Sequence, residues 1–328
     1  MTKFSTFLLL FCTCLVSLRA QQSTATTEVF SLPASVRANA MGGENVSVVE
    51  NDAQLALHNP ALLYNVEHRT LSLDFMNYAT GANMFGAQYV HAFGERHTGT
   101  AFARYLTAGS MDETDTHGNV LGTFTPKDIL FGAGYSYLLS DYWTGGANLK
   151  FAYSSLADFS AFSLAVDLGV NYYNPDKDLS IGIVAKNVGA QLANYTDRTE
   201  RVPFSLQAGL SKAFGSSPIH FHLTAVDLTK WNHRQYYTTS EDGKVSFTSN
   251  LLNHLVVGLD YVSPTDLFWL SLGYNFRRSY ELQAAGSSAL AGFTAGGGIH
   301  VKGFNFSLSY ARYHRAASNF MASASYSF

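Results

Sequence analysis

From about Leu71 to the C-terminus, large apolar residues alternate with small or polar residues at a period of two. This is the spacing of side chains on one face of a β-strand, so the pattern predicts strands with two unlike faces. The last two segments show it best. Their apolar faces carry Phe304, Phe306, Leu308 and Tyr310, and then Phe320, Ala322, Ala324, Tyr326 and Phe328. The opposite faces are mostly serine, alanine and asparagine, where a soluble sheet would commonly carry charge.

The composition restricts where such strands can reside. Charged residues make up 14% of the chain, against about 25% in soluble domains. Aromatic residues also make up 14%, and there are 27 glycines. Beyond the N-terminus no run approaches the roughly 18 apolar residues of a membrane helix. These features favour an all-β transmembrane barrel with apolar side chains toward lipid and small ones toward the lumen. The net charge of −3 does not suggest a nucleic-acid partner.

Fourteen segments fit this pattern, an even number, as single-chain bacterial barrels have. The predicted strands are 70–78, 83–93, 98–107, 129–139, 143–154, 160–173, 177–187, 202–214, 217–228, 252–263, 266–277, 289–301, 303–313 and 318–328. Short connections alternate with connections that are mostly longer, at about 108–128, 188–201, 229–251 and 278–288. Short periplasmic turns and longer outer loops are typical of this architecture. The first strand should therefore begin, and the last strand end, on the periplasmic side. The fold class expected is therefore a 14-stranded antiparallel transmembrane β-barrel.

The first 20 residues have the pattern of an export signal, with Lys3 before the apolar run 4–18 and Ala20 at the expected cleavage site. Both cysteines, Cys12 and Cys14, lie within this segment. A lipoprotein is the alternative interpretation, but Phe11 before Cys12 argues against it. The mature chain would then have no cysteine and no disulfide. We expect an integral outer-membrane protein, exported by a cleaved signal peptide.

Residues 21–69 predict an N-terminal plug-like segment, and residues 70–328 the barrel. The part from 28 to 66 does not have the pattern of a lipid-facing strand. Asp52 is placed to cap a short helix through Leu57, which the Asn59-Pro60 pair would end. At the other terminus, Tyr326 and Phe328 form the terminal aromatic pattern of a C-terminal assembly signal.

Several motifs in the chain resemble one family. Residues 37–43 (RANAMGG), 46–48 (VSV) and 59–62 (NPAL) are similar to the opening of the PorV/PorQ group of FadL-like barrels. Later segments, including 187–189 (NVG) and 201–204 (RVPF), resemble the PorQ branch. The likeness covers essentially the whole mature chain. It marks Gly42, Gly43, Asn59, Pro60 and Ala61 as family-motif residues of the plug.

This resemblance implies a fourteen-stranded barrel in the attachment complex of the type IX secretion system. In that complex it would anchor a PorZ-like surface protein beside a PorU-like sortase and a PorV-like barrel. Cargo proteins are joined there to anionic lipopolysaccharide of the outer membrane. The transpeptidation chemistry would belong to the sortase, so we expect this chain not to be an enzyme and to need no cofactor.

Two further functions remain open at this stage. A FadL-like transporter of small hydrophobic molecules would need a continuous apolar path past the plug. A surface enzyme would need a catalytic constellation, and no such motif stands out. For the anchor, the loop 229–251 is the candidate partner site, with Trp231, Arg234, Tyr236 and Tyr237 as interface residues. The alternative is that these aromatic residues line the outer membrane girdle.

The remaining polar clusters have ordinary interpretations beside functional ones. His220 and His222 share a strand face and could bind a metal, but no third ligand is identifiable, which favours paired lumen histidines. The loop residues Asp112, Glu113, Asp115 and Asn119 could bind calcium, or form a solvated loop. Asp74, Lys150, Asp167, Lys186, Asp260 and Arg277 fall on predicted lumen faces. These charges could line a pore or bind a transported ligand. The favoured interpretation is that they pair with one another and with the plug, with Arg37 as a candidate partner.

Overall fold

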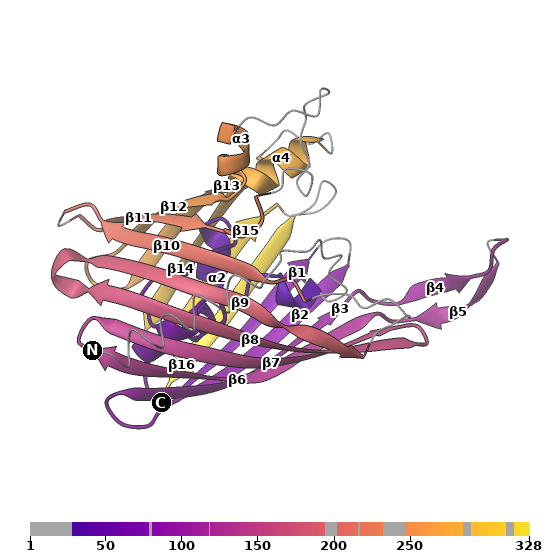
Figure 1. The fold of residues 1–328 in the computed structure, drawn as a ribbon, viewed down its shortest axis with the longest axis horizontal. Coiled ribbons are helices and arrows are strands. Elements are labelled where there is room, and N and C mark those ends of the chain that lie inside the picture. The colour runs from indigo at the N-terminus through magenta and orange to yellow at the C-terminus, as the bar shows by residue number, and fades with distance from the viewer. Residues whose placement is uncertain are drawn as a thin grey trace.

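The computed structural model describes residues 28–78, 81–117, 119–193, 202–215, 217–231, 247–284, 290–312 and 318–328. Within these residues, fourteen strands form one closed antiparallel barrel (Figure 1). Its strands are β1 (Thr70–Tyr78), β2 (Ala82–Ala92), β3 (His97–Thr107), β6 (Lys127–Ser140), β7 (Trp143–Leu156), β8 (Phe159–Asn174), β9 (Leu179–Ala193), β10 (Ser205–Ala213), β11 (Ile219–Ala225), β12 (Leu255–Val262), β13 (Phe268–Asn275), β14 (Phe293–Val301), β15 (Phe304–Ala311) and β16 (Asn319–Ser327). The predicted fold class is confirmed, and every predicted strand has its counterpart.

Pairing between the first and last strands closes the barrel. Thr70 of β1 lies opposite Ser327 of β16, and this register continues to Asn77 opposite Phe320. Each remaining wall strand pairs with its neighbours along the chain, except that β3 pairs directly with β6. A closed sheet leaves no unpaired edge, which is the condition for a sheet to cross hydrocarbon.

The two faces of the wall differ as the period-two pattern predicts. In β15, Leu308 is 67% exposed and the next residue, Ser309, is 3% exposed. In β16, Phe320 is 59% exposed and Met321 is 1% exposed. The exposed row is mostly aromatic or aliphatic around the barrel, as suits a surface in contact with acyl chains.

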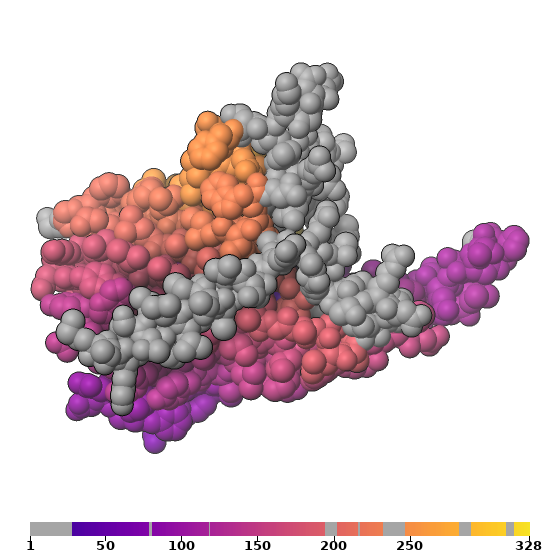
Figure 2. Space-filling model, viewed as in Figure 1, coloured from indigo at the N-terminus to yellow at the C-terminus, as the bar shows by residue number. Residues whose placement is uncertain are grey.

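The two ends of the barrel carry different connections. Six short connections lie at one end, after β2, β6, β8, β10, β12 and β14. The opposite end carries a separate hairpin of β4 (Met111–Thr114) and β5 (Val120–Phe124), together with helices α3 (Phe247–Leu252) and α4 (Phe276–Ala284). Figures 1 and 2 show the hairpin standing clear of the barrel wall.

One sequence expectation was wrong at this end. The longer connections are present as expected, and those at 108–128, 229–251 and 278–288 also contain the hairpin, most of α3 and most of α4, which the sequence did not predict. Arg277 was expected on the lumen face of a strand, but β13 ends at Asn275 and Arg277 lies in α4. The Asn275 side chain accepts a hydrogen bond from the backbone N–H of Arg278 at 3.0 Å, which caps the helix and ends the strand.

Residues 28–66, which we call the plug, lie inside the barrel. They form η1 (Glu28–Phe30), α2 (Val36–Ala40), η2 (Ala53–Leu57) and η3 (Pro60–Asn65). Asp52 caps η2 as predicted, accepting a hydrogen bond from the Gln54 N–H at 2.9 Å. η2 ends at Leu57, and Pro60 begins η3. Proline suits this first helical position, because the N–H group that it lacks would have no helical partner there.

Most plug residues are buried, and their apolar side chains supply much of the hydrophobic core. Small residues such as Ala38, Ala40 and Ala56 have no exposed surface. Ala38 and Ala40 belong to α2, which packs against β14 and β15, and Ala56 belongs to η2, which packs against η3 and β2. Among the described residues, no helix has both the length and the apolar character to cross a membrane.

A charge on the exposed row should destabilise the barrel. Leu272 lies near the middle of β13 and is 61% exposed, whereas Leu121 of the hairpin is 67% exposed. If only Leu272 meets hydrocarbon, Leu272→Arg should lower the free energy of unfolding in vesicles by about 2–4 kcal/mol. Leu121→Arg is the matched control, and we expect its effect to stay within about 0.5 kcal/mol. Equal effects of the two substitutions would contradict this assignment of faces.

Candidate functional site: the plug and the barrel wall

The glycine pair of the plug lies directly against the wall. Gly42 and Gly43 have φ of +99° and +95°, a region that favours glycine. The Gly42 N–H donates to the Thr294 hydroxyl at 2.8 Å, and its carbonyl accepts from the Asn275 side chain at 3.0 Å. A Cβ at the facing Gly273 would lie 2.3 Å from the Gly42 nitrogen. The backbone of the plug therefore reaches the wall only because both sides are glycine.

The Asn-Pro-Ala motif forms a second contact of the same kind. The Asn59 side chain caps η3 by accepting from the Ala61 N–H at 3.1 Å, and it donates to the Val46 carbonyl at 2.8 Å. Asn59 thus ties two plug segments together. A Cβ at Gly146 of β7 would lie 2.5 Å from the Pro60 carbonyl carbon, and one at Gly169 of β8 would lie 2.0 Å from Asn59 Oδ1. These wall glycines make room for the motif.

Arg37 is held between the plug and the wall. Its guanidinium forms an ion pair with Asp260 of β12 and a second with Glu50 at 3.0 Å. It also lies over the Trp269 ring, 4.6 Å from the centroid, a cation–π distance. The Ser271 hydroxyl donates to Asp260 at 2.9 Å. The structure therefore places Arg37 against one of the lumen-facing acids with which it was a candidate to pair.

Glu44 and His58 form a second charged contact, with Lys186 of β9. Glu44 lies 3.2 Å from the Lys186 ammonium and 3.3 Å from His58 Nδ1. Burial alone would raise the pKa of Glu44, but the Lys186 charge and the His58 hydrogen bond hold it well below its usual value. Burial lowers the pKa of His58. Its Nε2 accepts from the Ala34 N–H at 3.1 Å, which leaves Nδ1 to donate to Glu44.

A β-bulge in the wall supports a third polar group. The register of β8 and β9 shifts between Val166 and Leu168, and Asn187 opposite has φ of +57°. Lys150 lies 2.6 Å from Asp167 and donates to the Asn187 side chain at 2.9 Å. The Asn187 N–H donates to Asp167 at 2.7 Å. The bulge thus aims a backbone donor at a buried carboxylate.

Asp74 is the last of the lumen charges predicted from the sequence, and its partner is Arg104 of β3, which the sequence analysis did not single out. Their side chains lie 3.4 Å apart, and both reach the plug. Arg104 donates to the Pro33 carbonyl at 2.9 Å, and the Gln54 side chain donates to Asp74 at 3.0 Å. Five of the six predicted charges therefore lie inside the barrel, and Arg277 is the exception.

The histidine pair and the acidic loop make separate local contacts. His220 lies 3.0 Å from Asp178, and His222 Nδ1 lies 2.8 Å from the Ser211 hydroxyl. In the loop, Asp115 accepts from the N–H groups of His117 and Asn119 at 2.8 and 2.9 Å. No group of three potential metal ligands occurs in the part of the chain that the structure describes.

The predicted partner loop is described only at its two ends. Trp231 is 40% exposed, and its ring stacks on His254 with centroids 4.3 Å apart. Arg234, Tyr236 and Tyr237 lie outside the described residues. At the far end of the chain, Tyr326 stacks on Phe304 and contacts Phe328, which lies beside the start of β1.

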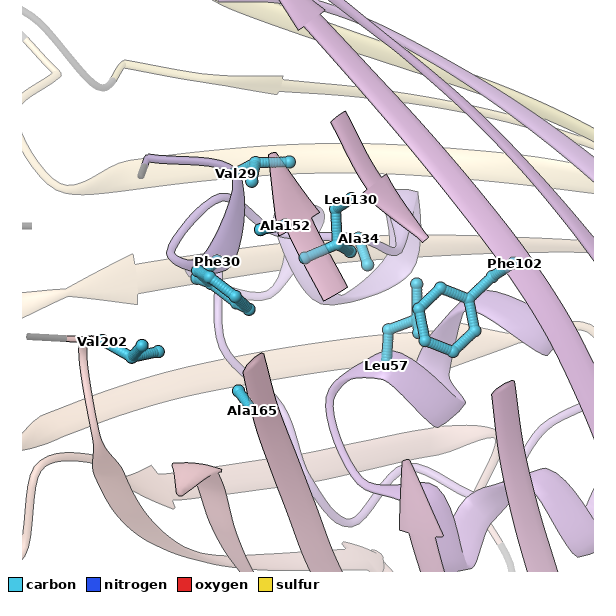
Figure 3. Packing of buried hydrophobic residues seen from close by; sticks show 9 residues of the cluster. All are labelled: Val29, Phe30, Ala34, Leu57, Phe102, Leu130, Ala152, Ala165 and Val202. Carbon is cyan, nitrogen blue, oxygen red and sulfur yellow. The ribbon is translucent and has the colours of Figure 1, made fainter. Parts of the chain in front are cut away.

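An apolar cluster joins the plug to the wall toward the end with the longer connections. Its members, drawn in Figure 3, are Val29, Phe30, Ala34, Leu57, Phe102, Leu130, Ala152, Ala165 and Val202. A small cavity lies beside it, lined by Phe30, Leu130 and other apolar residues together with Arg104, Lys150 and Lys186. Sequence reasoning missed this cluster, because its members come from plug and wall segments that are far apart in the chain.

Removing the Arg37 charge should release the plug. Arg37→Met removes the arginine partner of the buried Asp260, and breaking a buried ion pair costs about 3–5 kcal/mol. We expect increased proteolysis of residues 28–66 in the folded barrel. The double variant Arg37→Met/Asp260→Asn should recover part of that loss, because the side chain at 260 is then neutral and only Glu50 still lacks its partner. A single variant as protease-resistant as the wild type would show that this ion pair does not hold the plug.

The stability that the Asp227 ion pairs give to the end with the longer connections should depend on pH. Burial would raise the pKa of Asp227, but Arg277 and Lys230 outweigh it and lower the pKa from 3.8 to about 2. The folded state then binds this proton less readily than the unfolded state. The ion pairs therefore stabilise above the unfolded pKa, and the effect is lost as the pH falls from 3.8 toward 2. Asp227→Asn should lower stability by roughly 2 kcal/mol at pH 6. Thermal unfolding should show most of that difference lost at pH 2, where Asp227 is half protonated in the folded state.

Several solved structures share this architecture. No family model and no curated protein sequence matches the chain. Solved structures do match. The Ralstonia pickettii toluene transporter TbuX has a TM-score of 0.55 at 13% identity, over 90% of this chain and 98% of its own. The Pseudomonas putida toluene transporter TodX has a TM-score of 0.54 at 15% identity, over 88% and 96%.

A Pseudomonas aeruginosa FadL homologue matches over 94% of this chain and all of its own, with a TM-score of 0.51 at 12% identity. At these identities the likeness describes the fold. It extends over nearly the full length of each chain, including the barrel wall. The chain therefore has the fold of the FadL-like outer-membrane β-barrels.

Proposed function

We propose that this barrel carries small hydrophobic molecules across the outer membrane. The observation that carries the proposal is the apolar cluster between η1 and the wall, in a barrel whose fold is shared with hydrocarbon transporters. Leu130, Ala152 and Val202 lie toward the end of the wall that carries the longer connections, and Phe30 packs among them. A hydrophobic molecule entering from that side would meet apolar side chains first.

Beyond the cluster, passage requires the plug to move. The cavity beside it has a volume of only about 20 Å³, less than any organic substrate needs. The plug is held to the wall by ion pairs and hydrogen bonds, such as Ser47 to Ser211 at 2.8 Å. Such contacts can break and re-form without loss of the barrel, because the wall is closed by its own backbone pairing.

A disulfide between plug and wall tests this requirement. Ser47 lies in the plug and Ser211 in β10, and their hydroxyl oxygens are close enough for a cysteine pair to form a bond. The mature chain is expected to contain no other cysteine. The oxidised Ser47→Cys/Ser211→Cys barrel should lose uptake of labelled toluene in cells with a lipopolysaccharide outer membrane. Reduction should restore it.

The matched control places the disulfide within the wall. The hydroxyls of Thr70 in β1 and Ser327 in β16 are 2.9 Å apart, so Thr70→Cys/Ser327→Cys locks two strands and leaves the plug free. Its uptake should equal that of the wild type. Uptake that persists with the plug locked, or that never exceeds that of cells without the barrel, would contradict the transport proposal.

A second candidate is the anchor function in the type IX attachment complex, which the sequence motifs favour. Trp231 offers an exposed aromatic ring, held by its stack on His254 and by a 2.7 Å hydrogen bond to the Leu228 carbonyl. A preorganised tryptophan is a frequent interface hot spot. Deleting 229–251 should release a PorZ-like surface protein from detergent-solubilised membranes in an affinity pull-down. Retention of that protein would move the contact to another loop, and its absence from the wild-type sample would remove the anchor candidate.

A further inference from the structure

The lipid-facing wall is hollowed on one side. Strands β13, β14, β15, β16 and β1 together line an apolar groove with a volume of about 940 Å³, within the roughly 300–1,000 Å³ of small-molecule sites. Gly297 of β14 and Ala322 and Ala324 of β16 are small residues on the outward rows. Larger neighbours rise around them, including Phe75 and Phe306. The small side chains form the floor of the groove, and the larger side chains on adjacent strands form its sides.

The groove lies on the hydrocarbon side of an aromatic cluster. Phe304 stacks on Tyr326 with centroids 4.3 Å apart, and Tyr326 contacts Phe328 at 4.8 Å. These residues lie at the short-turn end of β15 and β16. Aromatic residues of this kind mark the boundary between hydrocarbon and headgroups. The groove begins two residue pairs further into the wall, where Phe306 pairs with Ala324.

Two cations lie on the headgroup side of the same cluster. Arg69 immediately precedes β1, and Lys302 lies in the turn between β14 and β15. Both are exposed, and neither forms an ion pair with another described residue. The Phe328 N–H donates to the Arg69 carbonyl at 3.2 Å, and the Ser327 N–H donates to the Gly303 carbonyl at 3.1 Å. Arg69 and Lys302 therefore flank the end of β16, the strand that supplies Ala322 and Ala324.

Two acids lie at this end of the groove: Glu67, which is exposed two residues before Arg69, and Asp266, in the turn before β13. Asp266 lies 3.5 Å from His300 and is separated from Arg69 by strands β14 to β16. An apolar groove, an aromatic boundary and two cations thus follow one another from the hydrocarbon toward the membrane surface. This is the order of parts in a phospholipid: acyl chain, glycerol and phosphate.

We propose that this groove is a binding site for a glycerophospholipid of the periplasmic leaflet. An acyl chain would lie over Gly297, Ala322 and Ala324, and the phosphate would lie between Arg69 and Lys302. The short-turn end is the periplasmic end in outer-membrane barrels, so the cations lie at the phospholipid leaflet. Lipopolysaccharide, in the other leaflet, would have its phosphates at the wrong end of the groove.

Native mass spectrometry of the purified full-length barrel, titrated with phosphatidylglycerol in detergent, tests the site. We expect one molecule to remain bound to the wild type. Ala322→Leu/Ala324→Leu fills the groove and should weaken binding at least about tenfold. Arg69→Gln and Lys302→Gln should each weaken it about fivefold. Ala103→Leu, at an exposed alanine on the outward row of β3, is the matched control and should leave binding unchanged.

Three results would overturn the site. Binding that is unaffected by the groove-filling pair would place the lipid elsewhere, and binding weakened equally by Ala103→Leu would show non-specific association. A lipid-free dimer that the groove-filling pair dissociates would identify a second copy of the chain as the occupant. Heat-modifiable migration on gels should confirm that each variant folds. Toluene uptake should be unchanged in all of them, so this test is independent of the transport proposal.

Discussion

Hydrocarbon offers no hydrogen-bond partner to a peptide group, and the rest of this structure depends on that constraint. The chain meets it by closing fourteen strands into a sheet whose first and last members pair with each other. Closure then divides every strand into a row that faces lipid and a row that faces the lumen. Leu272 and Ser271 are neighbours in sequence, yet one is 61% exposed and the other 2%.

The residue types of the plug follow from this division into a lipid-facing row and a lumen-facing row. The inward row is built from small and polar residues, and the plug occupies the space they leave with alanines, glycines and a few buried charges. Glycines such as Gly146 and Gly273 let the plug backbone lie directly against the wall. Buried ion pairs such as Lys186 with Glu44 connect the two. These ion pairs give one defined position for the plug, and their contacts can still break without opening the wall.

Much of this could be predicted from the sequence. The alternation predicted each wall strand, because a period of two is a local property of the chain. The lumen position of Asp260 and Lys186 followed from the same parity. The hairpin β4–β5 and helix α4 were missed, because their positions depend on the ends of long strands. The stop of β13 at Asn275 is an example, since it results from a side-chain cap that the period-two pattern does not contain.

The functional region was less accessible to sequence reasoning. The Asn-Pro-Ala motif marked the plug, but the wall glycines that it packs against, Gly146 and Gly169, lie about a hundred residues away in the sequence. The apolar cluster around Phe30 and the groove over Ala322 likewise join segments from distant parts of the chain. A charge on a lumen face predicts that a partner exists. Which residue is the partner is decided by how the plug folds back into the barrel.

The division of faces can be measured directly by labelling. Single cysteines placed at each position from 304 to 311 of β15, carrying a spin label in phospholipid vesicles, would report contact with lipid through their accessibility to oxygen. We predict high accessibility at 304, 306, 308 and 310 and low accessibility at the positions between them. Uniform accessibility along the strand, or high accessibility at 305, 307 and 309, would contradict the barrel and the account built on it.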